Sequence, residues 1–487
     1  DRLKYFNVGH RLDLSAGLLD VRGSRNLISF DDVQLDVRGD VRLGAAGFGD
    51  RGLNTKLAAP NRLTLSAAQI YPVTRSGGII AMGEYTVLGP QGEIAKYNPD
   101  AVLTLRRAAG DTPATPYSAF GAITLAAPLI EQGGVLRAPL GGITFESKSE
   151  TPSTVRFLPG SLTSISGDGL VMPYGGTVDG VKYLYAGKEV ELDATRSDGF
   201  LSRKINIQGK VIEVAEGAVL DLSGGGELTG GAFVRGRGGS VDVLRYAMAD
   251  ANPGFGFSRS GNAVYAIVPG FGGSQAPVAP DSGAGSPAVG RQVTIEAGVP
   301  GLPAGTYTLL PSTYALLPGA FRVELGAQGI NEASVAARTR GGSWVGSGRL
   351  GTALTGQVAT LSTRLLITPA DVVRRHAQYN ETTYNAFVLA DAARKGTQRG
   401  MLTTDARTLH LSLAEGAGRE DSPALSFKGA ARFDIPQGSG AYTGRLAVTG
   451  PASGIEILAP GQAPILPPKA AALYATDLNA LSPGAMF

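Results

Sequence analysis

A short phrase of alternating apolar and polar residues, flanked by Gly, Ala or Ser, recurs along this chain. Examples are Arg11-Leu-Asp-Leu-Ser-Ala16, Arg62-Leu-Thr-Leu-Ser-Ala67 and Lys204-Ile-Asn-Ile-Gln-Gly209. Alternation with a period of two places one side of an extended strand in a core and the other side in water. The phrase therefore predicts a protein built from many short, half-buried strands.

The spacing of these phrases separates the kinds of β protein. Leu103, Ile123 and Ile143 lie 20 residues apart, whereas strands of a hairpin sandwich follow one another every roughly 8–12 residues. A period near 20 is typical of one coil of a parallel β-helix, in which each turn stacks on the previous one. We therefore expect an all-β fold, a parallel β-helix (β-solenoid), with roughly 12 coils in residues 1–245. An ordinary β-sandwich is the alternative.

Composition supports this fold class and excludes others. The 487 residues include 70 glycines and only 17% charged residues, which suits short strands joined by tight turns. The net charge of +3 without a basic run lacks the electrostatic footprint of a nucleic-acid binder. No apolar stretch is long enough for a transmembrane segment. The absence of cysteine excludes a disulfide scaffold.

Changes in pattern along the chain predict five parts. Residues 1–245 are expected to form the β-helix shaft, and residues 246–290 a Gly/Pro/Ser-rich loop or linker. A mixed, partly helical β/α module is expected over 291–400, inserted in the C-terminal half. Alternating phrases return over 401–463 as further coils or strands, and 464–487 is expected to be a Pro/Ala-rich tail.

The helices of the inserted module have recognisable signals. Thr368 is expected at an N-cap, with Pro369 at the first helical position. Farther along, Tyr384 and Phe387 share a helical face, and Gly396 is a candidate for the end of that helix. These signals predict two helices between two strand-rich regions.

Several blocks of this sequence resemble filamentous haemagglutinin-type exoproteins, the large secreted partners of bacterial two-partner secretion. The resemblance rests on the Gly/Ala/Leu phrases at 121–142, 216–226 and 235–242. The Leu-Pro-Ala-Gly-Thr-Tyr-Thr-Leu-Leu-Pro block at 302–311, continued at 314–323, is similar to an uncharacterised conserved domain found in large members of that family.

The resemblance implies a right-handed parallel β-helix, export through an outer-membrane secretion pore, and an extracellular location on the bacterial surface. It further implies adhesion, with attachment to a host or bacterial receptor or glycan, or cell–cell aggregation as in a biofilm. The chain departs from the family pattern because Asn98-Pro-Asp100 is not the Asn-Pro-Asn-Gly-type signature of the secretion domain. Secretion is therefore expected to be a property of a longer parent chain.

Two other functions compete with adhesion: a self-assembling surface fibre without a receptor, and a β-helical enzyme that acts on polysaccharides. Such an enzyme needs clustered carboxylates as acid and base. Asp31-Asp32 is an adjacent acidic pair in a strand context, and the three histidines, His10, His376 and His410, are far apart in sequence. We expect Asp31-Asp32 to cap a coil, and we expect no catalytic residue, cofactor or metal.

Two features are candidates for binding. Arg38-Gly39-Asp40 is an integrin-type tripeptide at a predicted strand end, although roughly 0.2 such triplets arise by chance in a chain of this composition. Trp344 could stack on a sugar or contribute to an interface. A solvated turn and a core position are the respective alternatives.

The ends of a β-helix need cover because the terminal coils have unpaired backbone groups and an open core. No capping helix is predicted near Asp1, and only a Pro-rich segment follows Pro464. We therefore expect the shaft to continue into more of its own chain or to self-associate end to end with a neighbouring copy.

Overall fold

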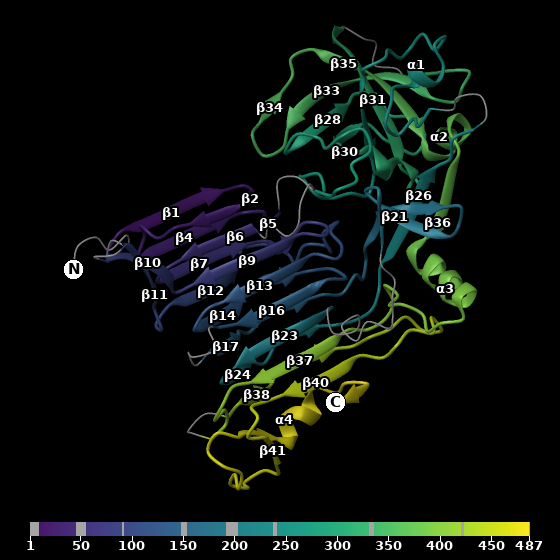
Figure 1. Ribbon diagram of the computed structural model, residues 1–487. Coiled ribbons are helices and arrows are strands. Elements are labelled where there is room, and N and C mark those ends of the chain that lie inside the picture. Colours follow the sequence, from purple (N-terminus) through teal and green to yellow (C-terminus); the bar gives the residue numbers. More distant parts are fainter. Residues whose placement is uncertain are drawn as a thin grey trace. The chain divides into compact units, whose positions relative to one another are not determined.

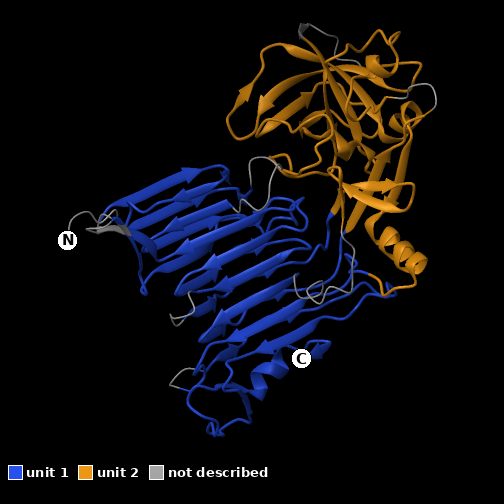
Figure 2. Ribbon diagram, viewed as in Figure 1, with its two compact units in different colours: residues 1–170, 193–226, 400–487 blue, residues 171–192, 227–399 orange. Residues whose placement is uncertain are grey.

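The computed structural model shows a predominantly β protein, with 45% of its residues in strands and 8% in helices. It describes residues 9–44, 55–89, 92–147, 153–190, 203–236, 241–330, 336–419 and 423–486. The chain divides into two compact units (Figure 2). Unit 1 comprises residues 1–170, 193–226 and 400–487, and unit 2 comprises residues 171–192 and 227–399.

Unit 1 is built around three large parallel sheets (Figure 1). In spatial order, sheet 1 contains β1 (Arg11–Ala16), β4 (Asp32–Val37), β7 (Arg62–Ala67), β12 (Val102–Arg107), β14 (Leu129–Gly133), β17 (Thr154–Phe157), β24 (Val211–Val214) and β38 (Leu425–Phe427). Sheet 2 contains β2 (Leu19–Val21), β5 (Asp40–Leu43), β8 (Gln69–Pro72), β15 (Val135–Arg137), β18 (Leu162–Ser164), β25 (Val219–Asp221) and β39 (Ala430–Arg432). Sheet 3 contains β3 (Ser24–Asn26), β6 (Thr55–Ala59), β9 (Gly77–Met82), β13 (Ala122–Ala126), β16 (Gly142–Glu146), β23 (Lys204–Gly209), β37 (Thr408–Leu413), β40 (Arg445–Thr449) and β43 (Ala485–Met486).

The chain visits the three sheets in turn, so that most coils add one strand to each. Leu12 of β1 pairs with Val33 of β4, and Val33 pairs with Leu63 of β7. The inward residues of the three sheets form one continuous aliphatic core. Between β9 and β12 the chain leaves this stack to form an antiparallel hairpin of β10 (Glu84–Gly89) and β11 (Gly92–Tyr97).

The repeat differs in detail from the sequence prediction. Leu103 lies in sheet 1 and pairs with Leu63 and Ile130, whereas Ile123 and Ile143 pair with each other in sheet 3. The spacing from Leu103 to Ile123 therefore joins two sheets of one coil. The prediction of roughly 12 coils is wrong because three strands and variable loops make most coils longer than 20 residues. Within the residues that the structure describes, the three sheets contain eight, seven and nine strands.

The stack is interrupted by the two segments of unit 2 and then resumes in register. Strand β37 pairs with β23, which precedes it by almost 200 residues, and aligns Leu409 with Ile205 and Leu411 with Ile207. Strand β38 likewise continues sheet 1 beside β24, and β39 continues sheet 2 beside β25. Hydrophobic positions on both sides of the interruption therefore belong to one core.

Unit 2 is built around an antiparallel nine-stranded sheet (Figure 1). Its members are β27 (Ala263–Ile267), β28 (Arg291–Ile295), β29 (Gly305–Thr308), β30 (Leu310–Pro311), β31 (Phe321–Ile330), β32 (Ala337–Arg338), β33 (Trp344–Thr352), β34 (Gln357–Val358) and β35 (Ser362–Pro369). Two smaller sheets have three strands each. One contains β19 (Val171–Pro173), β26 (Glu227–Phe233) and β36 (Tyr379–Thr383). The other contains β20 (Gly176–Val178), β21 (Lys182–Tyr185) and β22 (Lys188–Glu189). The helices are α1 (Met248–Ala251), the 3-10 helix η1 (Ser312–Leu316), α2 (Ala370–His376) and α3 (Tyr384–Lys395).

The boundary predicted at residue 245 differs from the structure, because the second segment of unit 2 begins at 227. The segment 246–290, expected to be a loop or linker, contains α1 and β27. Val264 and Ala266 of β27 are fully buried, and β27 pairs with β30 and β31 on its two sides. The sequence prediction missed this short strand because the Gly and Pro residues around it made the whole segment look like a loop.

The helix signals had mixed outcomes. As predicted, Tyr384 and Phe387 are buried on one face of α3, and Gly396 ends that helix in a left-handed conformation at φ 63°. Thr368, in contrast, does not cap α2. It lies in β35, fully buried, and its hydroxyl is 2.9 Å from the Ser343 hydroxyl. The N-cap of α2 is Pro369.

The C-terminal segment covers the last coils of unit 1 and is not a simple tail. Residues 464–487, predicted to be a tail, contain β42 (Ala471–Tyr474), α4 (Ala475–Ala480) and β43, and β42 pairs with β41 (Ile455–Leu458). Leu478 and Leu481 are buried in the core of unit 1, and the Asp477 carboxylate accepts a hydrogen bond of 2.8 Å from the Phe427 amide. The prediction that this end lacks a capping helix is therefore wrong.

The first coil differs from the last within the described residues. There β1 pairs only with β4, and Leu14 of β1 is 38% exposed. Among the described helices, none is long and apolar enough to cross a bilayer.

We predict that replacing both Leu478 and Leu481 with Ala will open the covered end of the stack. Each buried Leu→Ala change typically costs about 2–5 kcal/mol because it removes apolar contacts and leaves a cavity. Native-state hydrogen exchange should therefore become faster at the amides of β40. Leu389→Ala, at a 47% exposed position of α3, is the matched control and should leave this exchange unchanged. Equal protection of β40 in the double variant and the wild type would contradict a capping role for α4.

Candidate functional site

The tripeptide Arg38-Gly39-Asp40 forms the corner between β4 and β5. The Arg38 amide donates a hydrogen bond of 3.0 Å to the Ala16 carbonyl, and the Gly39 amide donates one of 3.0 Å to the Gly17 carbonyl. A Cβ atom at Gly39 would lie 2.5 Å from the Gly17 oxygen, so the coils approach too closely here for a side chain. The tripeptide is thus a stacked corner between two coils.

The three residues differ in how they face solvent. Arg38 is exposed, whereas Gly39 and Asp40 are half-buried. The Asp40 carboxylate accepts hydrogen bonds from Gln69, at 3.4 Å, and from the Tyr71 hydroxyl. Burial raises the pKa of the Asp40 carboxyl above its ordinary value. The Asp40 carboxylate is therefore engaged in hydrogen bonds within sheet 2.

Arg38 instead contributes to a surface groove of about 520 Å³ along one corner of the first four coils. The groove is lined by residues from the ends of β1, β4, β7 and β12, including Ser15, Gly17, Asp36, Arg38, Ser66 and Arg107. Its hollow form follows from the small residues that are stacked at this corner. Arg107 donates a hydrogen bond of 3.0 Å to the Gly110 carbonyl, and both arginines are exposed. The groove therefore presents two guanidinium groups, one carboxylate and two hydroxyls.

Trp344 begins β33 in unit 2. It is half-buried and packs against the hydrophobic core of the nine-stranded sheet. Its backbone pairs with Arg338 on one side and with Ile367 on the other. These contacts place the indole at the border of a core, where it also serves as the single tryptophan reporter of unit 2.

Asp31 and Asp32 have different partners. The Asp31 carboxylate accepts hydrogen bonds from the Asn61 side chain, at 2.6 Å, and from the Gly9 amide, at 3.4 Å. Asp32 begins β4 and lies 3.6 Å from an Arg11 nitrogen. Asp31 thus links neighbouring coils.

Of the histidines, His376 lies in unit 2, and His410 lies in β37 of unit 1, where Lys204 is 3.1 Å away.

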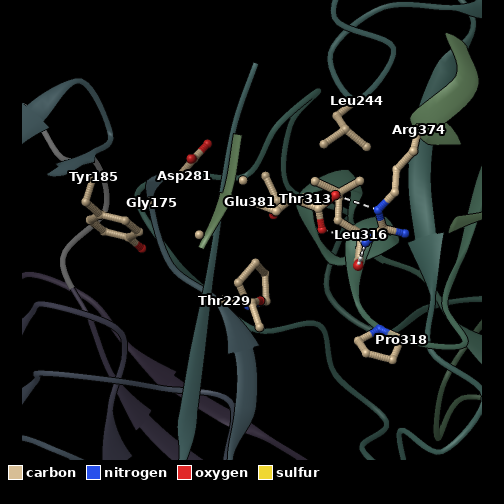
Figure 3. Close-up of a pocket in the computed structure, with 13 residues that line it drawn as sticks. Gly175, Tyr185, Thr229, Leu244, Asp281, Thr313, Leu316, Pro318, Arg374 and Glu381 are labelled. Carbon is tan, nitrogen blue, oxygen red and sulfur yellow. Dashed lines mark hydrogen bonds and ion pairs between the residues drawn. The ribbon is translucent and has the colours of Figure 1, made fainter. Parts of the chain in front are cut away.

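Unit 2 contains a pocket of about 140 Å³ that the sequence did not reveal (Figure 3). Its polar wall includes Tyr185, Thr229, Asp281, Thr313, Arg374 and Glu381. Its apolar wall includes Leu244, Leu316 and Pro318. In the view of Figure 3, Tyr185 lies at one side of the pocket and Arg374 and Pro318 at the other. These residues come from segments as much as 200 residues apart, and no local motif links them.

An ion pair fixes one wall of this pocket. Arg374 of α2 binds both carboxylate oxygens of Glu381, on β36, at 2.5 and 2.6 Å, and also donates a hydrogen bond of 2.6 Å to the Leu316 carbonyl. The hydrogen bonds to Glu381 raise the pKa of Arg374 above its ordinary value. The bidentate geometry holds the guanidinium in one orientation.

A second, fully buried ion pair anchors the segment that contributes Leu244. Arg322 Nη2 lies 3.0 Å from a carboxylate oxygen of Glu324, and its Nε donates a hydrogen bond of 2.6 Å to the Val243 carbonyl. Glu324 also accepts hydrogen bonds from the Met248 amide, at 2.9 Å, and from the Asn262 side chain, at 2.8 Å. Burial lowers the pKa of Arg322 below its ordinary value.

No protein-family model matches this chain, and neither curated proteins nor solved structures give a significant match. Among the described residues, no group of three or more His, Cys, Asp or Glu side chains is arranged to hold a metal ion.

We predict that Glu324→Gln will destabilise unit 2 by about 3–5 kcal/mol, because it leaves the Arg322 charge buried without a counter-charge. Urea unfolding followed by the fluorescence of Trp344 would measure this change. Asp371→Asn is the control. The Asp371 side chain is 68% exposed and pairs with Arg375, so its loss should change the free energy of unfolding by less than about 0.5 kcal/mol. A Glu324→Gln variant as stable as this control would show that the buried pair does not hold unit 2 together.

Proposed function

We propose that unit 1 is a right-handed parallel β-helix and that the chain is a non-enzymatic, extracellular segment of a filamentous haemagglutinin-like adhesin or surface filament. Its role in this proposal is attachment to a surface or cell–cell aggregation. The parent chain would reach the bacterial surface through an outer-membrane secretion pore. Support for the family comes from the phrases at 121–142, 216–226 and 302–311.

The main support for the proposal is that the stack of parallel strands resumes in register after unit 2. Leu409 and Leu411 align with Ile205 and Ile207 although a module is inserted between them. A scaffold that tolerates such an insertion can present modules and loops along its length while its core stays continuous. This architecture suits a protein that works through its surfaces.

The handedness rests on a general rule. A connection that returns to the same sheet and adds a parallel strand is right-handed in almost all proteins, because strand twist favours that path. Most coils of unit 1 make such a connection in each of the three sheets.

The arrangement of carboxylates favours binding over catalysis. Glu381 is held by Arg374, and Asp281 lies 3.2 Å from an Arg245 nitrogen. Asp31 is bound to Asn61. These carboxylates serve as structural partners, whereas a glycosidase needs a separated acid and base on either side of its substrate.

The proposal predicts that beads coated with the full chain will bind bacteria or epithelial cells saturably and that soluble chain will compete. Replacing Arg38 and Arg107 with Ala should weaken attachment severalfold, because both guanidinium groups of the groove are lost. Asp40→Asn should leave attachment unchanged, since that carboxylate is bound within sheet 2.

Arg25→Ala with Arg432→Ala is the matched control, because both arginines are exposed elsewhere on the stack. Attachment no greater than to albumin-coated beads would refute the adhesive function. Cleavage of a polysaccharide by the purified chain would establish the enzymatic alternative in its place.

A further inference from the structure

The pocket of unit 2 has hydrogen-bonding groups that the protein itself does not use. Arg374 directs its Nε and Nη2 groups to Glu381 and Leu316, and its two Nη1 N–H groups have no partner among the described residues. Asp281 accepts hydrogen bonds from Arg245 and Gly283 through Oδ1, whereas its Oδ2 has no described partner. Both side chains line the pocket, so these unused groups are candidates for contact with a ligand.

A hydroxyl and a closely packed floor complete the site. Thr313 lines the pocket, and its Oγ1 is buried without a hydrogen-bond partner in the described structure. At the floor, a Cβ atom on Gly231 would lie 2.7 Å from a methyl carbon of Leu316, so a larger residue would displace this wall. Buried polar atoms without partners are uncommon in folded proteins, and they indicate a place for water or a ligand.

The charged groups at the site already have partners within the protein. Glu381 is paired with Arg374, and Asp281 shares Arg245 with Asp242. A cation would therefore have to compete with an arginine for a carboxylate, and an anion would have to compete with Glu381 for the guanidinium. The remaining donors and acceptors suit a ligand whose own groups both donate and accept hydrogen bonds, as sugar hydroxyls do.

Size and apolar contacts agree with such a ligand. A volume of about 140 Å³ is similar to that of a cavity of about 150 Å³ that accommodates benzene, so the pocket has room for one six-membered ring. Leu244, Leu316 and Pro318 provide apolar surface for the C–H face of that ring. The Tyr185 ring stacks on Tyr174 with centroids 4.1 Å apart, which fixes its position in the wall.

We propose that this pocket binds one neutral pyranose unit of a glycan. Arg374 Nη1 donates to the sugar hydroxyls, Asp281 Oδ2 accepts from them, and Thr313 contributes its hydroxyl (Figure 3). The ligand class follows from the pocket alone, and only its use in attachment rests on the proposed function.

Saturation-transfer NMR on the full chain, with methyl glycosides of glucose, galactose, mannose and N-acetylglucosamine, tests the proposal. We expect at least one neutral glycoside to bind with a Kd on the order of millimolar, as for small ligands with few atoms. Galacturonate and glucosamine should bind more weakly than their neutral counterparts. No saturation transfer from any neutral glycoside at tens of millimolar, or tighter binding of a charged sugar, would overturn the proposal.

Variants locate the binding. Arg374→Lys keeps the charge but loses the planar fork, and should weaken binding about tenfold. Arg375→Lys, at the neighbouring and 69% exposed position, is the matched control and should leave binding unchanged. If Arg374→Lys does not fold by Trp344 fluorescence, Thr313→Val provides the test and should weaken binding severalfold. Unchanged affinity in a folded pocket variant would refute this site even if whole cells still attach.

Discussion

The stacking of aliphatic residues in register is the interaction on which unit 1 depends. One ladder runs through Ile143, Ile205, Leu409 and Leu446, all fully buried and paired across successive strands of sheet 3. Each rung has contacts and hydrogen bonds mainly with the coils next to it, so stability accumulates from neighbouring interfaces. The loops outside the ladder can then vary in length without changing the core.

This independence explains how unit 2 is inserted. The chain can leave the stack after β25 and return at β37, because β37 needs only the edge of β23 and the adjacent apolar positions. The cost of closing a long loop grows slowly with its length, and unit 2 has a core of its own. The last coils are covered in a different way. Leu478 of α4 and Leu481, which follows the helix, are buried in the core of unit 1. A helix suits this position because its backbone hydrogen bonds are internal and leave no strand edge exposed.

Polar networks place the candidate sites. Hydrogen bonds from Gln69 and Tyr71 hold the Asp40 carboxylate within sheet 2, while Arg38 lines the groove. In unit 2, the ion pair of Arg374 with Glu381 orients a guanidinium that lines a pocket. In both places, pairing within the protein decides which polar groups are left for a ligand.

The sequence alone determined the strand content, the apolar phrases of the stack, and the face and end of α3, because periodicity and glycine conformation act over short distances. It did not determine the coil length, since Leu103 and Ile123 look equivalent locally but belong to different sheets. Nor could it reveal that 263–267 is a buried strand paired on both sides. Only the tertiary structure decided the cap of the stack and the unit 2 pocket, because these depend on contacts between segments far apart in the chain, where spacing in sequence has no relation to distance in space.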